Sequence, residues 1–408
     1  MSSVNDFYCK SRKVSINFYR LLFIIKIFSN FVQNDTSMRK LFLSVLIVLA
    51  GCTSKPSVSV LEYGNLSTGE PVHKYVMTNA SGSTVEVCDF GARFIAVNVP
   101  DREGNLTDIV IGFDDIASIE AGQKTYRFMG CVIGRYANRI AGPAVTIDGQ
   151  EYEIECNENR GAPVQLHGGD MGFDRYLWDA RTIEEKERCG VRFTRLSPDG
   201  EAGLPGNVMC AVTYWLYNNN TCSIEYEAET DKPTFVNLSN HTYFNLKGYQ
   251  AGNVIDHIFM MDADSCIMNN RQSIPETIMA VEDSPFDFRT PNRFDYRMTA
   301  QNAGKVRNGS WIVNDWDGSL KKIADLYAPD CGRGVEVWST EPNLVTETCG
   351  SVDGTVMGKG GRLLQQYDGM LLETIHMADS PHQSRFPSTL LRPGEKYHSL
   401  TEYRFYAK

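Results

Sequence analysis

The sequence lacks the short motifs that mark several large enzyme classes. It contains no Gly-x-Ser-x-Gly, no His-Glu-x-x-His and no Gly-x-x-x-x-Gly-Lys-Ser/Thr stretch. These absences argue against a hydrolase with a nucleophile elbow, a zinc peptidase of the His-Glu-x-x-His type and a P-loop nucleotidase. None of the 11 cysteines forms a Cys-x-x-Cys pair, so neither a zinc ribbon nor a thioredoxin-type redox motif is indicated.

The chain has fewer basic than acidic residues. The chain has 40 Lys and Arg against 50 Asp and Glu, a formal net charge of −10, and this charge is uneven. The first 51 residues carry +5, which leaves −15 on the rest. Phosphate contact needs a basic face, so we expect no nucleic-acid partner. A neutral substrate fits this charge better than a polyanion does.

The sequence also has no long helical pattern and no internal repeat. Its 408 residues are 42% hydrophobic and 11% aromatic, which is typical of a globular protein with a large core. No stretch keeps an apolar period of about 3.6 residues, and no unit of about 20–50 residues recurs. Glycine (34) and proline (16) interrupt the chain throughout.

Short alternating segments predict β-strands instead. Residues 144–147 and 150–154 flank Asp148-Gly149, a pair that suits a tight type I′ hairpin turn. In residues 221–230 apolar side chains alternate with glutamates, as in a strand with one buried face. Similar segments are 191–196 and 210–217. We therefore predict one large all-β domain, a mostly antiparallel β-sandwich of two packed sheets.

The N-terminal region resembles a bacterial export signal. From Met38 a short basic stretch precedes an apolar run and a small-residue exit, which predicts a signal peptide over 38–51. Leu49-Ala50-Gly51-Cys52 resembles a lipobox, in which Cys52 would become the lipid attachment site. The apolar run is too short to span a bilayer.

These features define the predicted domain organisation. We expect translation to begin at Met38, so that 1–37 is an upstream extension not present in the native protein; one long signal anchor is the alternative. Residues 52–59 would form the lipidated cysteine and a tether, and 60–408 the folded domain. The protein would then be an exported lipoprotein, anchored in the membrane through Cys52 and facing the periplasm or cell surface. Nine further cysteines are expected to be buried thiols, unless export allows some of them to pair.

Four segments are denser in polar groups than a folded core requires: 134–140, 166–169, 240–246 and 372–376. Each has a structural explanation, such as a core histidine, a strand end or a salt bridge. His167, His241 and His376 lie far apart in the sequence without a local ligand pair, so we predict no metal site.

Together, these segments resemble one family. The stretches GRYANRIAG (134–142), LHGGDMGFDR (166–175), NLSNHTYFNLKG (237–248), PFDFRTP (285–291) and FPSTLLRPGEKY (386–397) are similar, in order, to aldose 1-epimerases (galactose mutarotases). The resemblance covers residues from about 60 to 408, and it implies the mutarotase-like supersandwich fold.

The resemblance implies a reaction and roles for single residues. The family interconverts the α and β anomers of free aldohexoses of the glucose and galactose type by opening and reclosing the ring, with no cofactor and no metal. Glu373 matches the base that takes the C1 hydroxyl proton, and His241 the acid that protonates the ring oxygen. The residues implied to bind substrate are Asn138, Arg139, His167, Thr242, Tyr243 and Asn308.

The sequence departs from the family in part of its sugar clamp. Asn308 stands where the family has an Asp that binds sugar hydroxyls, unless Asp315 or Asp317 replaces it from a shifted loop. Of two glutamines usual in the family, one falls near Val345 and the other at Ile375. These departures predict either an altered hexose preference or a weakened site.

Three alternatives remain. The first is a lipid-anchored sugar-binding protein with little or no turnover, although binding alone requires no acid and base pair. The second is an epimerase of phosphorylated sugars, which the export signal and the acidic body disfavour. The third is a fold-sharing domain of a glycoside hydrolase, for which no chain is left to form a catalytic domain. We expect a monomer whose partners are a free aldohexose and the membrane.

Overall fold

The computed structural model describes residues 55–122, 126–299, 308–350 and 352–408. Residues 56–79 and 83–408 form one compact unit. The predicted extension (1–37), signal peptide (38–51) and lipid attachment site (Cys52) lie outside the described residues. Within the described ranges, no helix is long and apolar enough to cross a bilayer.

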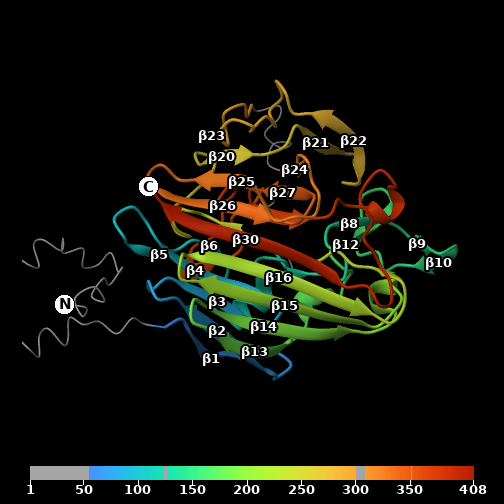
Figure 1. The fold of residues 1–408 in the computed structure, drawn as a ribbon, viewed down its shortest axis with the longest axis horizontal. Helices are drawn as coiled ribbons and strands as arrows, with labels where there is room; N and C mark the ends of the chain where they lie inside the picture. Colours follow the sequence, from blue (N-terminus) through green and yellow to red (C-terminus); the bar gives the residue numbers. More distant parts are fainter. Residues whose placement is uncertain (1–54, 123–125, 300–307, 351) are drawn as a thin grey trace, which may run out of the picture. The chain divides into compact units, whose positions relative to one another are not determined.

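The largest sheet has nine antiparallel strands and runs through the centre of the unit (Figure 1). Its longest strands are neighbours in space, although β16 and β30 are far apart in the sequence. In spatial order the strands are β13 (Asp179–Glu184), β14 (Arg188–Ser197), β15 (Val208–Tyr217), β16 (Thr221–Thr230), β30 (Tyr397–Ala407), β26 (Arg333–Ser339), β25 (Lys321–Tyr327), β20 (Ile258–Met261) and β23 (Asn292–Arg293).

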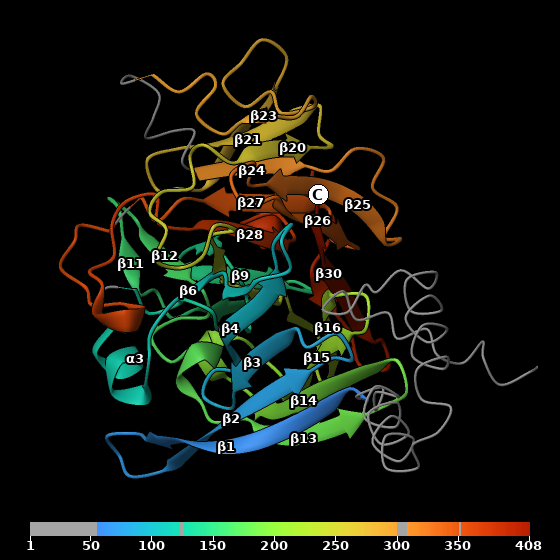
Figure 2. The ribbon, with the colours of Figure 1, turned by 90° about the vertical axis from the view of Figure 1, so that its left-hand side faces the viewer.

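A seven-stranded and a five-stranded sheet complete the main framework (Figure 2). The seven-stranded sheet has the order β22 (Pro275–Ala280), β21 (Ser265–Asn269), β24 (Asn308–Ile312), β27 (Asn343–Glu347), β28 (Met370–Ile375), β19 (Tyr243–Phe244) and β6 (Val110–Ile111). The five-stranded sheet consists of β1 (Ser57–Asn65), β2 (Pro71–Thr78), β3 (Thr84–Cys88), β4 (Arg93–Pro100) and β5 (Leu106–Asp108).

Smaller sheets and one short helix, α3 (Ile116–Gly122), connect the large sheets. A three-stranded sheet carries two of the polar segments predicted to be functional. The small sheets are β11 (Glu158–Asn159) with β12 (Pro163–Leu166) and β8 (Arg139–Ala141), β9 (Ala144–Ile147) with β10 (Gln150–Glu153), β7 (Val132–Ile133) with β18 (Ser239–Asn240), and β17 (Thr234–Phe235) with β29 (Leu390–Leu391).

One hydrophobic cluster unites the three large sheets. Phe193 and Tyr226 enter it from the nine-stranded sheet, Leu344 and Leu372 from the seven-stranded sheet, and Val87 from the five-stranded sheet. Burial of one face of each sheet is the main source of stability in such an arrangement. The predicted antiparallel β-sandwich is therefore confirmed.

The first strand begins earlier than the sequence indicated. Residues 57–59, which were assigned to the tether, belong to β1, where Ser57 pairs with Thr78 of β2. Val58 is partly buried against the main core. The ordered domain thus includes three residues of the expected tether, because β2 offers them a pairing edge that composition alone does not reveal.

The cysteines of the described part of the chain are nine free thiols. Seven are buried, and only Cys156 and Cys331 are partly exposed. This arrangement agrees with the expectation that they are buried thiols.

Candidate active site

Glu373 lies on β28, inside the seven-stranded sheet. Because side chains alternate along a strand, Met370 and Leu372 point into the main core, and Glu373 faces the other side with Leu371 and Ile375. Glu373 is only 1% exposed. Its Oε1 has no hydrogen-bond partner among the described residues. Such an atom in a folded protein needs an explanation.

His241 lies in the short link between β18 and β19. Its backbone N–H donates to the carbonyl of Cys131 (3.0 Å), and its carbonyl accepts from the N–H of Gly130 (2.9 Å). These two bonds fix the backbone on both sides of the side chain. The Nδ1 atom of His241 is buried and, within the described ranges, also has no hydrogen-bond partner.

Four rings lie in a row around His241. The centroid of the His167 ring is 4.6 Å from that of Phe128 and 5.2 Å from that of His241, and the two imidazoles are nearly perpendicular. The Tyr243 ring follows, 5.3 Å from His241. Tyr243 pairs with Leu371 on β28, two residues before Glu373. The two predicted catalytic residues therefore lie on the same side of the sheet, with Tyr243 beside both.

His167 is held by the segment that the sequence predicted to bind substrate with it. Its Nδ1 accepts a hydrogen bond from the backbone N–H of Asn138 (3.0 Å), and the backbone N–H of His167 donates to the Asn138 carbonyl (2.9 Å). Both residues have left-handed backbone angles (φ 52° and 61°). Gly168 passes so close to the carbonyl of Gly134 that a Cβ would lie 2.1 Å from that oxygen.

Arg139 forms an ion pair at the edge of this group. Its Nε is 2.7 Å from Oε2 of Glu158, which Arg160 also contacts at 2.7 Å. The positive charge of Arg139 acts on Glu373, whose pKa it lowers in part, and on His241. Arg139 therefore lies within electrostatic range of both predicted catalytic groups.

Burial determines the protonation of these groups. It raises the pKa of Glu373 to about 8, although Arg139 and a hydrogen bond with Ser239 act in the opposite direction. It lowers the pKa of His241 to about 4, since a buried imidazolium loses its hydration. The pKa of His167 falls well below its usual range because its ring is buried and because His241 and Arg139 are close. At pH 7 the carboxyl is protonated and both imidazoles are neutral.

Two residues predicted to bind substrate, Thr242 and Asn308, lie apart from the group around His241 and Glu373. Thr242 is 1% exposed, and its hydroxyl donates to the side chain of Asn240, so the structure places it in the core rather than in the candidate site. This follows from strand alternation, since Thr242 points away from His241 and Tyr243. Asn308 is exposed at the start of β24, two strands from Glu373.

Neither alternative aspartate replaces the family carboxylate. Asp317 is exposed and accepts hydrogen bonds from the N–H (2.9 Å) and hydroxyl (2.6 Å) of Ser319 in its own turn. Asp315 is also exposed and lies in the same loop. Instead, Glu347 of β27 lies directly across from Asn308 and accepts a hydrogen bond from the Tyr243 hydroxyl. No sequence pattern marks Glu347, because only the strand register brings it to this site.

The wall beside Glu373 is apolar. Val345 pairs with Glu373 across β27 and β28, and it packs with Phe128 against a buried cluster that contains Ile375 and Ala137. This wall explains why the Glu373 carboxyl is so poorly solvated. The two positions that depart from the family, Val345 and Ile375, thus both lie next to Glu373.

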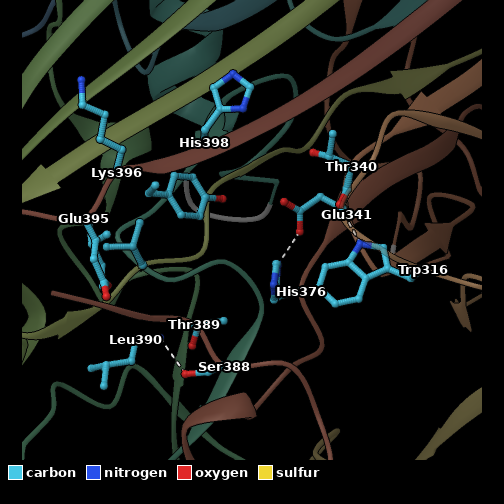
Figure 3. Close-up of a pocket in the computed structure, with 14 residues that line it drawn as sticks. Trp316, Thr340, Glu341, His376, Ser388, Thr389, Leu390, Glu395, Lys396 and His398 are labelled. Atoms are coloured by element: carbon cyan, nitrogen blue, oxygen red, sulfur yellow. Dashed lines mark hydrogen bonds and ion pairs between the residues drawn. The ribbon is translucent and has the colours of Figure 1, made fainter.

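His376 faces a different cavity, although it follows Glu373 by three residues. Its Nδ1 is 2.6 Å from Oε2 of the buried Glu341, and Trp316 lies beside the ring (Figure 3). Burial alone would lower the pKa of His376, but the Glu341 carboxylate raises it overall. This pocket of about 430 Å³ is lined by neither Glu373 nor His241.

The candidate site thus combines the buried Glu373 carboxyl, the imidazoles of His241 and His167, further polar side chains and an apolar wall. It could take a proton from one atom of a small polar ligand and deliver a proton to another. Its Arg139 is already paired with a carboxylate, so the group favours a neutral ligand over an anion.

Comparison with known sequences and structures gives consistent results. The sequence profile described as aldose 1-epimerase matches residues 73–404. The galactose mutarotase of Homo sapiens is 34% identical over 358 residues, which are 86% of this chain and 98% of that protein. The aldose 1-epimerase of Escherichia coli (strain K12) is 32% identical over 346 residues, 83% of this chain and 97% of that one.

Solved structures show the same fold. An aldose epimerase homologue from C. elegans superposes with a TM-score of 0.70 at 26% identity and covers 86% of this chain and 99% of its own. A galactose 1-epimerase from Lactobacillus acidophilus has a TM-score of 0.72 at 24% identity, with coverages of 86% and 99%.

Proposed function

Because the chain belongs to the aldose 1-epimerase family, it is an isomerase that interconverts sugar anomers, and we propose that Glu373 and His241 act on free aldohexoses of the glucose and galactose type. Glu373 takes the proton of the C1 hydroxyl while the bond between C1 and O5 breaks. His241 gives a proton to O5, and the open-chain aldehyde results. After rotation about the C1–C2 bond, closure on the other face returns both protons.

The observation that carries this assignment is the pair of unpartnered buried atoms. Oε1 of Glu373 and Nδ1 of His241 lack hydrogen-bond partners among the described residues, and both belong to residues beside Tyr243. An unmet buried polar atom costs about 1–3 kcal/mol. Sugar hydroxyls and the ring oxygen would satisfy these atoms. An acid and a base at opposite ends of the breaking bond also prevent separated charge from building up.

Replacing either group tests the proposal. Glu373→Gln and His241→Asn should each lower the mutarotation rate of freshly dissolved α-D-glucose, followed by polarimetry, by about 10²–10⁴-fold. Glu276→Gln is a matched control, since Glu276 is exposed on β22 of the same sheet. Near-normal rates for either site variant, with an unchanged circular dichroism spectrum, would refute the assignment. A wild-type protein that binds glucose without accelerating the reaction would favour the sugar-binding alternative.

We also propose that the enzyme is exported and anchored through a lipid on Cys52. The support is the sequence from Met38 to Cys52, with its basic start, apolar run and lipobox-like end. Two or more acyl chains on one cysteine would give stable attachment. Mass spectrometry of the mature protein should find an acylated Cys52 as the first residue. A mature chain that begins at residue 1 would overturn this proposal.

A further inference from the structure

A second carboxylate lies on the same side of the sheet as Glu373. Glu347 and Val345 alternate along β27 on one face, and Val345 pairs with Glu373 while Glu347 pairs with Leu371. One strand across and two residues along place the Cα atoms of the two glutamates about 8 Å apart. The two carboxyl groups therefore lie close enough to contact the same small ligand on this side of the sheet.

Glu347 is linked to the candidate site by a direct hydrogen bond. Its Oε2 accepts from the hydroxyl of Tyr243, whose ring lies beside His241. Its Oε1 accepts from the backbone N–H of Gly350. Glu347 is partly exposed, so these bonds fix its carboxylate at the surface of the site.

The neighbours of Glu347 make its charge important there. Val345 gives the wall next to Glu373 no hydrogen-bonding group, and the residue paired with Glu347 on the other side is Asn308. An amide at 308 and a carboxylate at 347 mean that the acidic group expected on β24 stands one strand closer to Glu373. Compared with the family pattern, this part of the site thus keeps a negative charge, but on β27 instead of β24.

Resting on the proposed function, we propose that Glu347 binds the substrate by accepting hydrogen bonds from ring hydroxyls remote from C1. A carboxylate offers about four acceptor positions, and the partial exposure of Glu347 gives a sugar hydroxyl access to it. Bonds from hydroxyls to an ionised carboxylate are short and strong. Glu347 would thus select sugars by the hydroxyl that it contacts, while Glu373 and His241 act at C1 and O5.

The test combines one substitution with a series of deoxy sugars. Anomer exchange is measured by NMR for D-glucose and its 2-, 3-, 4- and 6-deoxy analogues, with wild type, Glu347→Gln and the control Glu276→Gln. Wild type should disfavour, by about 10-fold or more in kcat/KM, the analogue that lacks the contacted hydroxyl. Glu347→Gln should lower kcat/KM for glucose by about 10–100-fold and abolish that discrimination.

A purely structural role for Glu347 gives a different result. A glutamine keeps one acceptor oxygen for Tyr243, but its NH2 group cannot accept from the N–H of Gly350. A carboxylate with only this structural role would therefore lower kcat/KM for glucose and for every deoxy analogue by the same factor. Tyr243→Phe removes that bond directly and, on our proposal, leaves the discrimination among deoxy sugars intact.

Three results would overturn the proposal. One is a Glu347→Gln protein within about twofold of wild type on glucose. Another is unchanged discrimination in that variant, and the third is Tyr243→Phe reproducing its whole pattern. Glu373→Gln is measured in the same assay. If Glu373→Gln is inactive and Glu347→Gln is normal, only the role of Glu347 fails, whereas a wild type no faster than the uncatalysed reaction overturns both proposals.

Discussion

At the scale of single residues, burial determines where the proton of the catalytic pair resides. With a pKa of about 8 for Glu373 and about 4 for His241, the pair holds one proton between these pH values, and it is on the carboxyl. The reacting form that we propose, a carboxylate with an imidazolium, is a minor tautomer of the same state. Its fraction therefore does not change with pH as long as the pair holds one proton.

This protonation predicts the pH profile of kcat/KM, which reports on the free enzyme. Below about pH 4 His241 gains a proton while Glu373 keeps its own, so the rate should fall as the pH falls. Above about pH 8 Glu373 loses its proton, the pair is left with none, and the rate should fall again. Between these limits the profile should be flat. With unperturbed pKa values of about 4.3 for Glu373 and 6.5 for His241, the rate would instead begin to fall below pH 7 as the pH rises, because the imidazolium would lose its proton. Initial rates of mutarotation from pH 3.5 to 9.5 decide between the two.

The sequence revealed some site residues and not others. Glu373, His241, His167 and Arg139 lie in stretches with a recognisable pattern, and the structure brings all four together. Glu347 could not be found this way, because its relation to Glu373 depends on which strands pair and in what register. Thr242 was assigned to the site although alternation along the strand turns its side chain into the core.

At the scale of elements, local pairing was predictable and distant pairing was not. The hairpin of β9 and β10 forms around Asp148-Gly149 as predicted, since both residues adopt positive φ (51° and 82°). The pairing of β16 with β30 joins residues about 170 to 180 positions apart and has no local signal in the sequence. The predicted tether extended three residues too far for the same reason, because the partner strand of β1 decides where pairing begins.

Two glycines with the same backbone angle should respond very differently to alanine. Gly149 (φ +82°) has open space where a Cβ would be, whereas a Cβ on Gly168 (φ +84°) would lie 2.1 Å from the Gly134 carbonyl oxygen. Gly149→Ala should cost about 1–2 kcal/mol of unfolding free energy, from the left-handed backbone alone.

Gly168→Ala should cost at least about 2 kcal/mol more, because backbone atoms must move apart. It should also raise KM, since Gly168 adjoins His167. Urea unfolding of both variants measures the difference in stability. Equal costs would show that the turn after β12 relaxes and that close backbone approach does not fix the position of His167.

At the scale of the whole molecule, the alternating apolar pattern predicted the fold class. Apolar residues that alternate over many short segments can be buried only by packing sheets together, and the main core confirms this. The pattern could not predict the division into sheets of nine, seven and five strands, because that division depends on which distant strands pair.

The acidic body of the enzyme should make it selective for uncharged sugars. Residues 52–408 carry −15, and the nearby cations Arg139 and Arg127 are paired with Glu158 and Asp174. The negative charge of the domain would repel a hexose 6-phosphate, and the arginines that could bind its phosphate are already paired with carboxylates.

At an ionic strength of about 0.01 M, where the screening length is about 30 Å, kcat/KM for glucose 6-phosphate should be at least about 10-fold below that for glucose. The difference should shrink at about 0.5 M salt, whereas the value for glucose should change less than about twofold, because a neutral ligand feels no net force from the field. A phosphorylated sugar used as well as glucose at low salt would contradict this prediction and favour the sugar-phosphate alternative.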